Sequence, residues 1–130
     1  MEFVQRTHPT ATDYWDGNWV AVRVRVRVGG FDGRADGDLR AGELLGFREQ
    51  LGRLHSTLRG EAVFETMEEW LSVRLTGDGL GHIEAKGFLL DRPGIGNRLD
   101  FTLKLDQTDL PNTIRGLDDA CRRYPVIGNP

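Results

Sequence analysis

The 130-residue sequence has a single cysteine, Cys121, so no disulfide can form within the chain. It has no apolar run long enough to cross a bilayer, and its first residues lack the basic and apolar regions of a secretory signal. We therefore expect a protein of a reducing compartment, the cytoplasm. The length is that of one domain, which we expect to span residues 1–130 around a single core.

The sequence also lacks a strong excess of either charge. Its 17 lysines and arginines are interspersed with 20 aspartates and glutamates, which leaves a net charge of −3. Such a balance provides no general attraction to nucleic acid or to an anionic membrane. We expect neither as a partner.

Motifs of catalysis and metal binding are scarce as well. No Gly-x-Ser-x-Gly elbow occurs, and the histidines are far apart, with no His-x-x-x-His spacing. The segment from Asp32 to Glu43 fits most positions of an EF-hand calcium loop, but Arg34 puts a cation where an oxygen ligand belongs. We interpret this segment as an acidic turn leading into a helix, and expect no enzymatic activity, no metal and no cofactor.

The most informative stretch is the strictly alternating one from Trp19 to Val28. Valine occupies every second position, so the valines share one face of a β-strand while Arg23, Arg25 and Arg27 share the other. We expect the valine face to lie in the core and the arginine face to lie in water.

Alternation and turn residues predict further strands, at residues 3–10, 31–39, 61–66, 70–76, 81–90 and 98–106. Apolar residues spaced three and four apart predict helices at 41–58 and 108–123. Short, turn-rich connections favour antiparallel neighbours. The sequence therefore predicts an α+β fold. A single antiparallel sheet of six or seven strands carries both helices on its valine face, in the order β-β-β-α-β-β-β-β-α.

The outer face of this predicted sheet is the candidate functional surface. Its mixed charges suit a cross-strand ion-pair lattice that keeps the sheet in solution. Arginine and tryptophan are also the residues enriched at interface hot spots, so the same face suits a protein partner. The candidate partner-binding residues are Arg23, Arg25, Arg27, Trp70 and Arg74.

Five stretches together resemble the WapI-like family of small bacterial immunity proteins, many of them uncharacterised actinobacterial sequences. These stretches are residues 13–19, 28–31, 68–71, 75–82 and 105–110. The resemblance implies a cytoplasmic antidote that binds and neutralises a cognate polymorphic toxin domain. Because the shared residues belong to turns and strands, it implies no particular catalytic or binding residue.

Two other classes of function stay open at this point. A small-ligand or hydrolase-like site between sheet and helices would appear as a sizeable pocket with convergent polar groups. An adaptor domain that oligomerises through a sheet edge would reveal itself in size-exclusion chromatography. The oligomeric state does not follow from the sequence.

Overall fold

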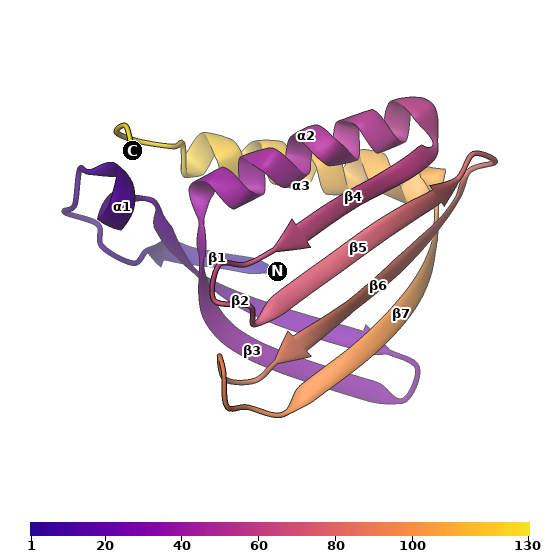
Figure 1. The fold of residues 1–130 in the computed structure, drawn as a ribbon, viewed down its shortest axis with the longest axis horizontal. Coiled ribbons are helices and arrows are strands. Elements are labelled where there is room, and N and C mark those ends of the chain that lie inside the picture. The colour runs from indigo at the N-terminus through magenta and orange to yellow at the C-terminus, as the bar shows by residue number, and fades with distance from the viewer.

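The computed structural model describes residues 1–130, whose strands and helices are drawn in Figure 1. In chain order the elements are β1 (Glu2–Arg6), α1 (Tyr14–Gly17), β2 (Trp19–Val28), β3 (Phe31–Arg40), α2 (Ala41–Thr57), β4 (Arg59–Glu65), β5 (Leu71–Asp78), β6 (His82–Leu90), β7 (Arg98–Asp106), the short 3₁₀ turn η1 (Gln107–Asp109) and α3 (Leu110–Arg123). This mixture of helices and antiparallel strands confirms the predicted α+β class. None of the helices combines the length and the apolar character needed to span a membrane.

The strands form two separate sheets, so the prediction of a single sheet is wrong. One sheet has three strands in the order β1-β2-β3, and the other has four in the order β4-β5-β6-β7. All neighbouring strands are antiparallel. The predicted order of elements also needs correction, because the structure has a short helix, α1, after β1 and the 3₁₀ turn η1 before α3.

The division into two sheets follows from what the helices are able to cover. An α-helix is about 10 Å across and neighbouring strands lie roughly 4.8 Å apart, so two helices cover about four strands. The apolar faces of a seven-stranded sheet would stay partly in water. Instead the two sheets turn their apolar faces towards each other, and α2 and α3 lie side by side along the top of the molecule in Figure 1.

The valine face of β2 lies in the core, as its alternation predicts. Val20, Val22 and Val24 are buried in one apolar cluster with residues of α2, α3 and the four-stranded sheet. A second cluster, which includes Leu51 of α2 and Leu110 of α3, packs against the other end of the four-stranded sheet. The valines are therefore covered by the second sheet as well as by the helices.

Trp70 joins the two sheets. It precedes β5, is completely buried, and donates a 2.9 Å hydrogen bond from its indole nitrogen to the backbone oxygen of Asp38 on β3. A side chain at Gly37 would overlap the indole ring, so this close approach requires a glycine. The contact fixes β3 against the start of β5.

A small lobe at the N-terminal end is built around Arg40. The guanidinium group is buried and donates hydrogen bonds to the backbone oxygens of Trp15 (3.0 Å) and Tyr14 (2.8 Å). It also lies 5.1 to 5.8 Å from the ring centres of Tyr14, Trp15 and Trp19, within the range of cation–π attraction. Arg40 therefore orders α1 and its flanking aromatic residues.

We expect replacement of Gly37 by alanine to destabilise the protein by about 1–3 kcal/mol, because the added methyl group must displace the Trp70 ring. The measurement is urea unfolding, with a lower midpoint and an unchanged slope. Gly30→Ala is the matched control, because a methyl group there meets no atom within 4 Å. Equal midpoints for the two variants would contradict the role assigned to the Trp70 contact.

Candidate partner-binding surface

The arginine face of β2, formed by Arg23, Arg25 and Arg27, lies on the outer side of the three-stranded sheet and is exposed. Its main neighbours are the aspartates of β3. Arg25 donates two hydrogen bonds to Asp32, of 2.9 and 2.6 Å, and Arg27 lies 3.9 Å from the same carboxylate. Arg23 lies 3.6 Å from Asp36. The arginine face is thus part of a cross-strand ion-pair lattice.

The electrostatics of this lattice centre on Asp32. The hydrogen bonds from Arg25 lower the pKa of the Asp32 carboxyl group, and the charges of Arg25, Arg27 and Arg34 act in the same direction. The pair is solvent-exposed, so its contribution to stability is small. Its main effect is to orient the Arg25 guanidinium group.

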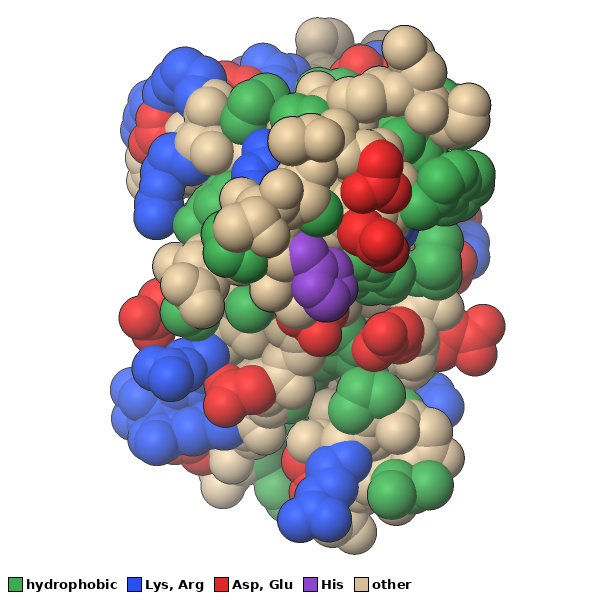
Figure 2. All heavy atoms as spheres, turned by 90° about the vertical axis from the view of Figure 1, so that its left-hand side faces the viewer, with side chains coloured by type: hydrophobic (Ala, Val, Ile, Leu, Met, Phe, Trp, Pro, Cys, Tyr) green, Lys and Arg blue, Asp and Glu red, His purple; other side chains and the backbone are tan.

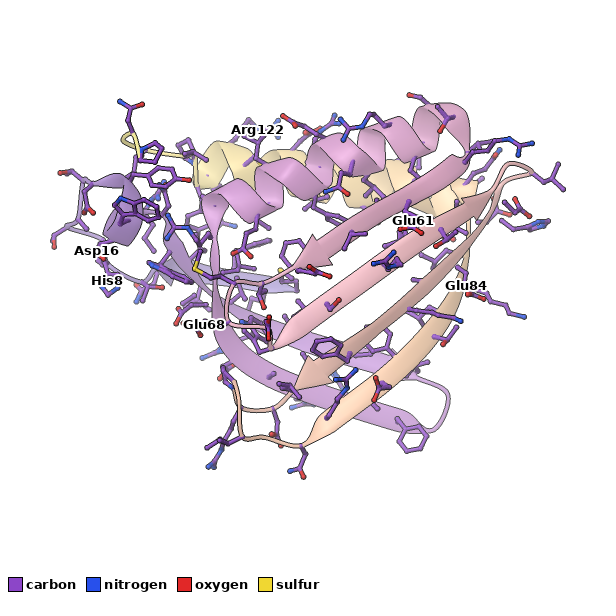
Figure 3. All side chains as sticks on the ribbon, in the orientation of Figure 1. His8, Asp16, Glu61, Glu68, Glu84 and Arg122 are labelled. Carbon is purple, nitrogen blue, oxygen red and sulfur yellow. The ribbon has the colours of Figure 1, made fainter.

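Two of the five predicted site residues do not lie on this face. Trp70 is buried between the sheets and has no exposed surface to offer a partner. Arg74 lies on the outer side of the four-stranded sheet, where it pairs with Glu61 at 2.6 Å. Figure 3 shows Glu61 and Glu84 on that sheet. Because the sheets turn their inner faces together, their outer faces point away from each other, and the prediction that these residues share one surface is wrong.

Between the two sheets and the helices lies an apolar cleft of about 590 Å³ that is partly open to solvent. Of its 20 lining residues 16 are hydrophobic, and several of these keep some exposure, among them Val26, Phe47, Val73 and Leu103. The lining contains no group of convergent polar side chains such as an enzyme site requires. The cleft is suited to apolar atoms.

A second exposed surface lies at the end of the molecule that faces the viewer in Figure 2. Figure 3 labels His8, Asp16 and Glu68 at this end. Trp15 and Met67 are 59% and 60% exposed there, and neither Asp16 nor Glu68 forms an ion pair. The sequence from Tyr14 to Trp19 predicts a loop or hairpin turn, whereas the structure has the short helix α1 at Tyr14–Gly17. The density of tryptophan and tyrosine around an Asp-Gly step was the only indication of an exposed aromatic side chain.

Glu43 is the carboxylate with the most unusual surroundings. It is half-buried in the first turn of α2, where it accepts a 2.6 Å hydrogen bond from the backbone nitrogen of Arg40. Burial raises the pKa of Glu43, although hydrogen bonds from the backbone of Arg40 and Met67 partly offset this effect. Its lone pairs cap the helix, so Glu43 has a structural task.

The segment from Asp32 to Glu43, which resembled a calcium loop, forms strand β3 and the first turn of α2. Asp32 and Asp36 side chains extend from the outer face of β3, whereas Glu43 caps the helix at its end. An extended strand cannot wrap these oxygens around one ion in the way that an EF-hand loop does.

At Cys121, burial raises the pKa of the thiol and so favours its protonated form.

Comparison with known proteins gives one family. The model of the immunity protein WapI-like family matches residues 1–125, which confirms the resemblance predicted from the sequence. No individually curated protein matches the chain.

We expect Glu43→Gln to become more stable relative to the parent protein as the pH rises. The pKa of Glu43 is raised in the folded state. Its contribution to the free energy of unfolding of the parent protein is therefore fully present below the unfolded pKa, and is lost as the pH rises through the folded pKa. Glutamine keeps the oxygen that accepts from Arg40 but carries no charge.

The measurement is the free energy of unfolding of both proteins between pH 4 and pH 7. Glu49→Gln, on the exposed side of α2, makes the same substitution away from the cap. A Glu43→Gln variant that becomes less stable relative to the parent as the pH rises would show that the hydrogen bonds to the charged carboxylate outweigh its burial, and a difference that does not change with pH would show that the two effects cancel.

Proposed function

Because the chain belongs to the immunity protein WapI-like family, we propose that it acts in the bacterial cytoplasm as an antidote that binds a cognate toxin domain and blocks it. It does so as a binding protein, without catalysis, metal or cofactor. The observation that carries this proposal is the family match, because it extends over residues 1–125 and therefore over every strand and helix.

The structure supports a binding role through the rigidity of its exposed surface. The arginine face is built on two ten-residue strands that pair along their whole length, and its opposite side is anchored in the core. Arg25 is held by two hydrogen bonds to Asp32, so little side-chain entropy is lost when a partner contacts it. Arginines in such positions are frequent hot spots.

We therefore assign partner contact to Arg23, Arg25 and Arg27, and leave Trp70 and Arg74 outside the contact surface. The arginine face presents both signs of charge in a fixed pattern, since Asp32 and Asp36 lie between the arginines. A partner must match this pattern charge by charge, and a mismatch of like charges is strongly unfavourable. A mixed lattice of this kind gives specificity for one toxin over its relatives.

A second candidate function is the binding of a small apolar molecule, and the cleft of about 590 Å³ is the observation that favours it. Pockets of this size hold drug-sized ligands. The two candidates differ in a measurement that needs no toxin. If the protein binds small apolar molecules, adding such a molecule should raise the melting temperature of the isolated protein. If the protein is an antidote without a small ligand, the melting temperature should stay the same.

We expect the protein to restore growth of cells that express the toxin domain encoded beside its gene. The double variant Arg23→Glu, Arg25→Glu should keep its melting temperature within a few degrees, because exposed substitutions change stability by about 0.5 kcal/mol. It should lose at least ~2 kcal/mol of toxin affinity, about 30-fold, and with it the rescue.

The matched control is Arg74→Glu, Lys86→Glu, the same change of charge on two paired residues of the opposite sheet. This control should bind and rescue like the parent. No rescue by the parent protein would refute the antidote function. Full rescue by both double variants would exclude the arginine face and direct attention to the surface around Trp15.

A further inference from the structure

Strand β2 has an unpaired stretch along one edge. On one side it pairs with β3 from Trp19 to Val28, but on the other side β1 pairs with it only as far as Arg23. The difference arises because β1 has five residues and β2 has ten. The second half of β2 therefore has a sheet neighbour on one side only.

The peptide groups that face this gap belong to Arg25 and Arg27. The oxygen of Trp19 accepts a hydrogen bond from Thr7, beyond the end of β1, whereas the oxygen of Asn18 accepts one from Ala41, beyond the end of β3. Peptide groups alternate between the two edges of an antiparallel strand, so odd-numbered residues of β2 face the β1 side. We call the backbone groups of Arg25 and Arg27 the free edge of β2.

The free edge borders the apolar cleft. Arg25 and Arg27 are among the residues that line the cleft, and their peptide groups point to the β1 side of the strand. No residue of β3, whose outer edge also lacks a neighbouring strand, lines the cleft. The free edge of β2 thus offers hydrogen-bond donors and acceptors beside an unfilled apolar space. The outer edge of β3 has no such space beside it.

The side chains around the free edge define what a strand added there would carry. Its residues on the inner face would enter the cleft, beside Val26 and Phe3, and should be apolar. Its residues on the outer face would lie beside Arg25 and Arg27 and should be acidic. The first two residues of β1 already show this pattern, because Glu2 lies opposite Arg23 while the next residue, Phe3, lines the cleft.

We propose that the free edge of β2 binds an extended segment of a partner protein, in which acidic and apolar residues alternate, as an added strand that covers the apolar cleft. The source of the segment rests on the function proposed above, in which the partner is a toxin domain. Strand addition uses the backbone for affinity and the alternate side chains for specificity. It places the arginine face at the centre of the contact.

A second copy of this chain is a poor occupant of the same edge. Two β2 edges placed side by side would set Arg25 and Arg27 of one copy beside the same arginines of the other. Like charges directly across a pair of strands are destabilising. A partner with carboxylates at these positions avoids this repulsion.

The test uses the capped peptide acetyl-Val-Glu-Val-Glu-Val-Glu-amide as the probe and amide hydrogen exchange as the readout. We expect the peptide to slow exchange at the Arg25 and Arg27 amides by roughly tenfold or more at saturation, because both amides gain a hydrogen-bond acceptor. A peptide with lysine in place of glutamate should leave both exchange rates unchanged, because its charges match those of the arginines.

Methylation of the peptide nitrogens tests the geometry of the added strand. In an antiparallel pair, a peptide residue directly opposite Arg25 has its side chain on the outer face. Its backbone N–H and C=O groups point towards β2 and exchange hydrogen bonds with those of Arg25. Methylation of the glutamate nitrogens should therefore abolish binding. Methylation of the valine nitrogens, which face away from β2, should leave binding within about threefold of the parent peptide.

A matched pair of variants tests the charges. Arg27→Glu, next to the free edge, should weaken peptide binding by about tenfold or more, whereas Arg34→Glu, on the same face but on β3, should weaken it by less than about threefold. Both substitutions are at exposed positions, and circular dichroism checks that both variants fold.

Four outcomes would overturn the proposal. These are unchanged exchange at Arg25 and Arg27, protection confined to the amides of β7, equal effects of the two methylated peptides, and protection of the same two amides by self-association without peptide. Each of these results is independent of the toxin. A failure of the parent protein to rescue cells would instead refute the antidote function, and the peptide result would still decide whether the free edge accepts a strand.

Discussion

Trp70 carries its indole ring from the start of β5 across to β3, where it lies against Gly37 and donates its hydrogen bond to the Asp38 carbonyl. A buried tryptophan contributes the largest apolar area of any side chain, and loss of such a ring costs about 3–5 kcal/mol. Here that burial connects two sheets that share no backbone hydrogen bond. The position of one sheet relative to the other depends on this contact.

The stacking of two sheets decides which surfaces are available to a partner. In a single sheet the arginines of β2 and Arg74 of β5 would lie on one continuous face. In the stacked arrangement they lie on opposite sides of the protein, and Trp70 lies between them. The arginine face is consequently a compact surface of the three-stranded sheet, bounded by β1 on one side and the β3 edge on the other.

Ion pairing and partner binding are compatible on this surface. The exposed pairs from the arginines to Asp32 and Asp36 add little stability, because water and salt screen them. They hold the guanidinium groups in position and discourage random edge-to-edge association of a long strand. The same arrangement presents a defined charge pattern, which is the kind of surface that selective partners recognise.

The sequence by itself determined the local periodicities and their immediate consequences. Strict alternation from Trp19 to Val28 placed the valines inward and Arg23, Arg25 and Arg27 outward, as the structure confirms. The helix predicted at 41–58 appears as Ala41–Thr57, because its apolar stripe has a period that only a helix satisfies. These features follow from contacts between residues close in the chain.

Only the tertiary structure decided which strands share a sheet. Helix α2 separates β3 from β4, and a helical connection sets no register between the strands that flank it, so local patterns could not show that pairing stops there. Local patterns likewise could not indicate that Trp70 faces inward or that Arg40 lies against three aromatic rings, because both contacts join residues far apart in the chain. The free edge of β2 exists because β1 stops pairing at Arg23 while β3 continues to Val28. The alternation within each strand does not show how far its neighbour extends.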